Sequence, residues 1–77
     1  MDQRQELYRG HQLDVAIDGD EVSGYYIARQ TARFAPMGSS MNVPFPTARF
    51  ADREAAFSDA FGRLRAVVDN REGRPGD

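Results

Sequence analysis

The chain has 77 residues, a net charge of −2 and no cysteine. This length limits it to one domain with a thin core, and the lack of cysteine excludes a disulfide framework and a thiolate metal site. No apolar stretch of about 18 residues occurs, so no membrane span is predicted. The slightly acidic balance disfavours nucleic-acid binding by bulk charge. We expect a small cytoplasmic domain, and the use of Arg without Lys is typical of a GC-rich bacterial genome.

A strand is predicted over residues 7–17, where Leu13, Val15 and Ile17 alternate with more polar positions. A period of two places one set of side chains on a core. Asp18-Gly19-Asp20 follows, and Asp and Gly both suit the tight turn of a hairpin.

A second strand is predicted from about Val22 to Thr31. Its alternation directs Tyr25 toward the core and Tyr26 toward the opposite face. We also expect Tyr8 on that opposite face. An exposed Tyr is a frequent anchor of protein interfaces.

Residues 35–42 predict a loop, because Pro36 and Gly38 interrupt a small, polar segment. A third strand is predicted over residues 43–47. Its prolines lack the amide proton that a central strand would donate, so the pattern favours an edge position.

The helix has the clearest signals. Asp52 is a predicted N-cap, and an apolar stripe follows at helical spacing, made up of Phe57, Ala60, Phe61, Leu64, Val67 and Val68. Asp59 with Arg63 and Arg65 with Asp69 stand four residues apart, as helical ion pairs do. The helix is expected to end near Asn70, with residues 70–77 forming a disordered polar tail.

These elements predict an α+β domain over residues 1–69: a three-stranded antiparallel β-meander followed by one C-terminal amphipathic helix packed on one face of the sheet. The element order across residues 7–69 is similar in layout to partial double-stranded-RNA-binding folds, including bacterial antitoxins of the HicB class, and to AP2-like DNA-binding domains. No motif accompanies the likeness, so no functional residue is carried over.

No catalytic, metal or cofactor site is predicted. His11 is the single histidine, and the sequence has no cysteine and no serine-containing elbow motif to accompany it in catalysis. Asp18, Asp20 and Glu21 form an acidic cluster, but their spacing differs from that of a calcium loop and suits a turn. The chain has no phosphate-binding glycine motif. We expect no enzyme activity and no cofactor.

The leading hypothesis is a protein-interaction or self-associating module, with a protein partner or a homodimer. Gly62 lies in a small-residue strip on the exposed side of the helix, and tolerance of a surface Gly is the plainer explanation for it. The candidate interface consists of Tyr8, Tyr26, Ala55, Asp59, Gly62 and Ala66. The alternative is a nucleic-acid-binding accessory or antitoxin-like regulator that uses surface arginines such as Arg49, Arg53, Arg63 and Arg65.

Overall fold

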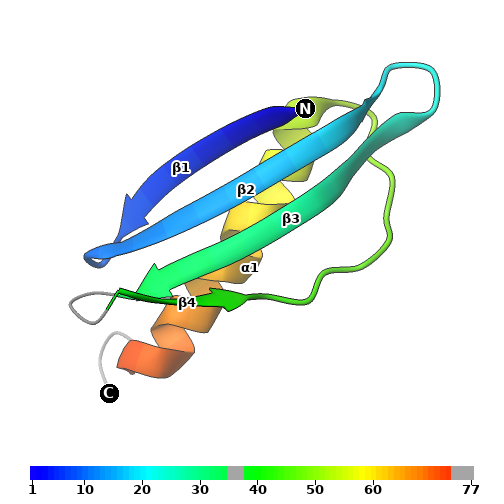
Figure 1. The fold of residues 1–77 in the computed structure, drawn as a ribbon. Helices are drawn as coiled ribbons and strands as arrows, with labels where there is room; N and C mark the ends of the chain where they lie inside the picture. The colour runs from blue at the N-terminus through cyan, green and yellow to red at the C-terminus, as the bar shows by residue number, and fades with distance from the viewer. Residues whose placement is uncertain (35–37, 74–77) are drawn as a thin grey trace.

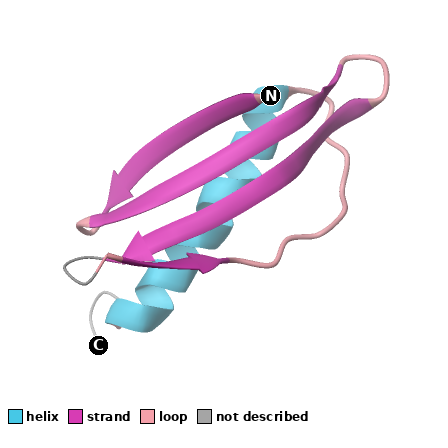
Figure 2. Cartoon of the chain, viewed as in Figure 1, coloured by secondary structure: helices cyan, strands magenta, loops and turns pink. Residues whose placement is uncertain are grey.

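The computed structural model describes residues 1–34 and 38–73. Their elements are, in chain order, β1 Asp2–Tyr8, β2 His11–Asp20, β3 Gly24–Phe34, β4 Ser39–Asn42 and α1 Arg53–Glu72. The strands form one antiparallel sheet in the order β1-β2-β3-β4, and α1 lies across one face of it (Figures 1 and 2). The predicted α+β layout is confirmed, with four strands in the sheet where three were expected.

The segment predicted as one strand over residues 7–17 contains a reversal of the chain. Arg9 and Gly10 form a two-residue turn with φ of 52° and 84°. The turn joins β1 to β2, whose pairing begins with Tyr8 opposite His11. Positive φ at both central residues is characteristic of the type I′ hairpin turn. The boundary was missed because Arg seldom adopts this conformation and β1 has no apolar alternation.

The second turn lies at residues 21–23, three residues after the predicted one. The Asp20 carboxylate accepts hydrogen bonds from the Ser23 amide (2.7 Å), the Ser23 hydroxyl (2.9 Å) and the Val22 amide (2.9 Å). These bonds hold the pKa of Asp20 below its ordinary value. Asp20 therefore serves the turn, as its type predicts.

The third predicted strand is misplaced. β4 occupies Ser39–Asn42, inside the predicted loop, whose residues 35–37 lie outside the described part of the chain. Residues 43–49 have no regular structure. β4 is a polar segment held by backbone pairing with β3. It has no alternation of apolar and polar residues from which a strand could be predicted.

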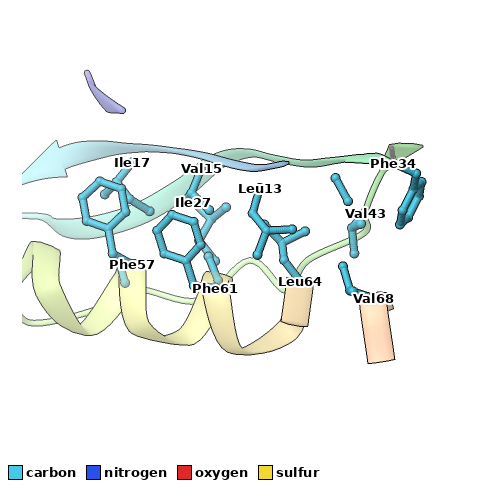
Figure 3. Close-up of a cluster of buried hydrophobic side chains, with 13 residues drawn as sticks. Leu13, Val15, Ile17, Ile27, Phe34, Val43, Phe57, Phe61, Leu64 and Val68 are labelled. Atoms are coloured by element: carbon cyan, nitrogen blue, oxygen red, sulfur yellow. The ribbon is translucent and has the colours of Figure 1, made fainter. Parts of the chain in front are cut away.

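The core lies between the sheet and α1, as Figure 3 shows, with side chains of both layers pointing toward each other. Leu13, Val15 and Ile17 of β2 are each at most 1% exposed. The predicted helix stripe is confirmed, with Val67 partly buried and the other members buried. Tyr25 packs against this core, as expected.

Both helix ends have identifiable causes. The Asp52 carboxylate accepts a hydrogen bond from the Ala55 amide at 2.8 Å, which confirms the predicted N-cap. The helix continues to Glu72 and ends at Gly73, whose φ is 88°. It thus runs two residues past the predicted end at Asn70, while residues 74–77 of the expected tail lie outside the described residues.

A buried amide ties the chain after β4 to the sheet. Gln30 on β3 is 1% exposed, and its Nε2 donates to the carbonyls of Val43 (3.1 Å) and Pro44 (3.0 Å). Its Oε1 accepts from Arg63 at 3.1 Å. Further along, Phe50 and Tyr25 exchange backbone hydrogen bonds of 2.8 and 2.9 Å. Residues 43–50, hereafter the strap, therefore lie along β3.

Candidate functional site

The two edges of the sheet differ. On the β3 side, the outermost strand is the short β4, and the other end of β3 is covered by the strap, which Figure 1 shows running past β3 toward the start of α1. On the opposite side, β1 is the outermost strand. It is seven residues long, pairs with β2 without a register shift and contains no proline. Within the described residues nothing pairs with its outer edge.

The hairpin turn determines which amides of β1 face outward. In a two-residue hairpin the flanking residues form a hydrogen-bonded pair, and such pairs alternate with non-hydrogen-bonded ones. Tyr8 flanks the turn, so Tyr8, Glu6, Arg4 and Asp2 direct their backbone groups toward β2. Gln3, Gln5 and Leu7 direct theirs outward. These three residues have exposed side chains as well.

The charged side chains of β1 are engaged by the helix. Arg53 donates to Asp2 (2.6 Å), Arg4 forms a two-pronged contact with Glu54, and Arg65 donates to Glu6 (2.7 and 3.0 Å). Paired guanidinium and carboxylate groups neutralise each other's charge at the strand.

Two of these contacts also shift carboxylate acidity. The hydrogen bond from Arg53 holds the pKa of Asp2 below its ordinary value, and the one from Arg4 does the same for the pKa of Glu54. The predicted pair Arg65–Asp69 does not form, because Arg65 bonds to β1.

The carboxylate of Asp69 anchors the turn end of β1. It accepts hydrogen bonds from the Tyr8 hydroxyl (3.0 and 3.1 Å) and from Arg9 (2.9 Å). The bond to Asp69 raises the pKa of Tyr8 above its ordinary value. Tyr8 therefore lies on the helix side of the sheet and packs against the core. The prediction that it shares the open face with Tyr26 is wrong, because the missed turn reversed its parity.

The open face of the sheet is polar. Tyr26 is half-buried there, and the Arg49 guanidinium lies 4.6 Å from its ring centroid. Arg29 and Arg33 of β3 are exposed on this face and make no ion pair within the described part of the chain. Asp14 of the neighbouring β2 faces the same side.

The small-residue strip on α1 is exposed. Ala55, Asp59, Gly62 and Ala66 all face solvent in the described chain. Asp59 accepts from Arg63 at 2.6 Å, the helical pair predicted from the sequence. A Cβ placed on Gly62 would meet no atom within 4 Å. The structure brings neither Tyr8 nor Tyr26 to this strip.

His11 is 4% exposed, which makes it a core-side residue of β2. Its Nε2 lies 2.9 Å from a Glu72 carboxylate oxygen, and its ring meets Phe34 edge-on at 5.4 Å between centroids. These contacts join the start of β2 to the end of α1. Among the residues that the structure describes, no group of three or more potential ligands is arranged to hold a metal ion.

An open groove of about 450 Å³ separates β1 from α1. Arg4 and Glu6 line one wall, Glu54 and Arg65 the other, and Phe57 and Phe61 contribute to its surface. The Arg4 guanidinium lies 4.2 Å from the Phe57 ring centroid. Gln5 of the free edge of β1 also lines the groove, so the two features adjoin.

The comparisons with known proteins give no relative. No family model, no curated protein and no solved structure matches the chain. No helix among the described residues has the length and apolar character that crossing a membrane requires.

The sequence interpretation placed the interface on Tyr8, Tyr26 and the helix strip, and it missed the edge formed by Gln3, Gln5 and Leu7. One local signal for this edge was present. Every second residue of this segment is charged, namely Asp2, Arg4 and Glu6. This pattern is typical of a strand whose inner face meets a charged partner.

Proposed function

We propose that this chain is a protein-interaction module that binds an extended strand along the open edge of β1. A long, regular edge presents unpaired amides and carbonyls, which are a template for another strand. The proposal includes the cytoplasmic location expected from the sequence.

The single observation that carries the proposal is the contrast between the two edges. Proteins commonly protect edge strands with short length, prolines, bulges or unpaired charge. The β3 side is protected in this way, by a four-residue β4 and a strap that contains Pro44 and Pro46. β1 has seven residues, and its charged groups are already paired with α1. The undefended edge is thus the one that remains available to a partner.

A proline at position 5 tests the proposal. The Gln5 amide points away from β2, so Gln5→Pro removes an outward donor and leaves the internal ladder intact. Gly62→Ala is the matched control, because it alters the rival surface on the helix strip. Wild type and both variants serve as baits for protein partners, and circular dichroism verifies that each is folded. Binding that is lost in Gln5→Pro and retained in Gly62→Ala is expected.

Hydrogen exchange then locates the bound strand. In the monomeric chain the amides of Gln3, Gln5 and Leu7 should exchange rapidly, while those of Arg4 and Glu6 are held by β2. In the complex the three outward amides become protected. A complex in which they still exchange rapidly, or in which Gln5→Pro binds as well as wild type, would refute the proposal.

Arg29 and Arg33 support a second candidate function, nucleic-acid binding through the open sheet face. Exposed guanidinium groups without a carboxylate partner are able to contact phosphates. Asp14, on the same face, opposes this binding. The test is a titration with single- and double-stranded oligonucleotides at low salt, in which binding should weaken steeply as salt rises. Absence of binding at low salt, or binding unchanged in Arg29→Ala with Arg33→Ala, would exclude it.

A further inference from the structure

We propose that the strand bound at β1 is β1 of a second copy of this chain, antiparallel to the first about a two-fold axis at Gln5. This inference rests on the proposed function and names its partner. Its basis is the sequence of β1, Asp-Gln-Arg-Gln-Glu-Leu-Tyr, whose charges complement each other when the strand is reversed upon itself.

Symmetry allows few registers. A two-fold axis perpendicular to the sheet keeps each side chain on its own face of the sheet. Directly opposite residues must share a face, so the axis must lie midway between the two copies of one residue. The three central choices are Arg4, Gln5 and Glu6. An axis at Arg4 places Arg4 opposite itself and Asp2 opposite a Glu6, and an axis at Glu6 places that carboxylate opposite itself. Like charges directly opposite each other are destabilising, which disfavours both registers.

An axis at Gln5 places opposite charges together. Arg4 then faces Glu6 of the partner subunit, and the reverse contact follows by symmetry. Because these residues direct their own backbone groups toward β2, they form a non-hydrogen-bonded pair across the interface, the kind with the closer side chains. On the helix side a row of alternating charge results: Glu54, Arg4, and then Glu6 of the partner subunit.

The outward backbone groups match in the same register. Gln5 pairs with its own copy, and Gln3 pairs with Leu7 of the partner subunit, each as a hydrogen-bonded pair. The side chain of Leu7, which is 77% exposed in the single chain, gains a cross-strand neighbour. The two four-stranded sheets join into a continuous one of eight strands, with both helices on the same face.

A cysteine at position 5 tests the partner and the register together, since the chain has no cysteine of its own. In a hydrogen-bonded antiparallel pair the Cα atoms lie about 5.5 Å apart, which is within the range that a disulfide spans. Gln5→Cys, oxidised with copper phenanthroline, is expected to form a covalent dimer on a non-reducing gel. At least about tenfold more dimer is expected than for the controls.

The controls are Gln3→Cys and Leu7→Cys, two exposed positions on the same edge and face. Each alone places its sulfur four residues from its copy, so little cross-linking is expected. In an equal mixture they should give about half as much cross-linked dimer as Gln5→Cys, because Gln3 lies opposite Leu7 of the partner subunit and half of the dimers contain one chain of each variant. Cross-linking that is equal at all three positions, or absent from the mixture, would overturn the register.

The solution mass of the wild-type chain separates this inference from the proposed function. Light scattering across concentration should show a dimer, and Gln5→Pro should raise the dissociation constant at least about tenfold, because both backbone bonds at the axis are lost. A wild-type monomer at every concentration would overturn the inference. The proposed function would then stand only if Gln5→Pro still abolished capture of a different protein.

Discussion

Replacement of Gln30 by Met should destabilise the domain, because the buried amide donates two hydrogen bonds from β3 to the strap. Met has a similar length and volume, so the change removes hydrogen bonds without opening a large cavity. It leaves the carbonyls of Val43 and Pro44 without this donor, and the Arg63 guanidinium keeps its bond to Asp59 but loses this acceptor.

The magnitude follows from where each of these groups lies. The bond to Val43 is buried, and an unsatisfied buried carbonyl costs about 1–3 kcal/mol. The bonds to Pro44 and Arg63 are partly buried, so water can replace the amide there and each loss costs about 0.5–1 kcal/mol. The expected loss is about 2–5 kcal/mol. A domain of this size is typically stable by about 4–12 kcal/mol, so the loss is a large fraction of its total stability.

Urea denaturation followed by far-UV circular dichroism measures this loss, at one protein concentration for every variant, because self-association would make stability depend on concentration. Gln12→Met is the control, since Gln12 lies half-buried on the opposite face of the sheet. The melting temperature should fall by about 10 °C or more in Gln30→Met. A free energy of unfolding within about 0.5 kcal/mol of wild type would show that the amide does not hold the strap.

Three further predictions concern the helix and its contacts with β1. Gly62→Ala should stabilise the domain by about 1 kcal/mol in thermal denaturation, because the added methyl meets no atom and Ala favours the helix; a loss of stability would contradict this. Asp52→Ala should cost about 1 kcal/mol, since the Ala55 amide loses its acceptor, while Asp52→Asn should restore most of it. Stability should fall in acid, because the pKa values of Asp2 and Glu54 lie below their ordinary values of 3.8 and 4.5 in the folded chain. The two carboxylates therefore stabilise the folded chain above about pH 4.5, and this stabilisation is lost as the pH falls through the lowered pKa values. Glu54→Gln should flatten part of this dependence in an acid titration of unfolding, and an unchanged profile would argue against the ion pair with Arg4.

The layout of the fold was predictable where burial leaves a pattern. The alternation of Leu13, Val15 and Ile17 located β2, and the helix stripe located α1, because in each case one side of the element enters the core. β1 lacked this signal because its inner side meets charged residues of α1 through ion pairs. β4 was misplaced for a related reason: backbone pairing with β3 holds it, and no apolar side dictates its position.

The candidate site was less accessible to sequence reasoning. An open edge is a property of strand order, and the order could not be derived while the turn at Arg9 and Gly10 was unrecognised. The same error placed Tyr8 on the wrong face. The helix strip around Gly62 was correctly predicted to be exposed, but exposure alone does not distinguish an interface from an ordinary solvated surface.

The strap has a consequence for how far assembly can proceed. A sheet with two free edges can add copies indefinitely and grow into a fibre, whereas a two-fold contact uses the same edge of both subunits and closes on itself. With a strand of four residues and the strap on the other side of the sheet, pairing at β1 would stop at two chains. Gln30 and the Tyr25–Phe50 bridge would then act as the terminators of growth, and detachment of the strap would expose the second edge from which polymers begin.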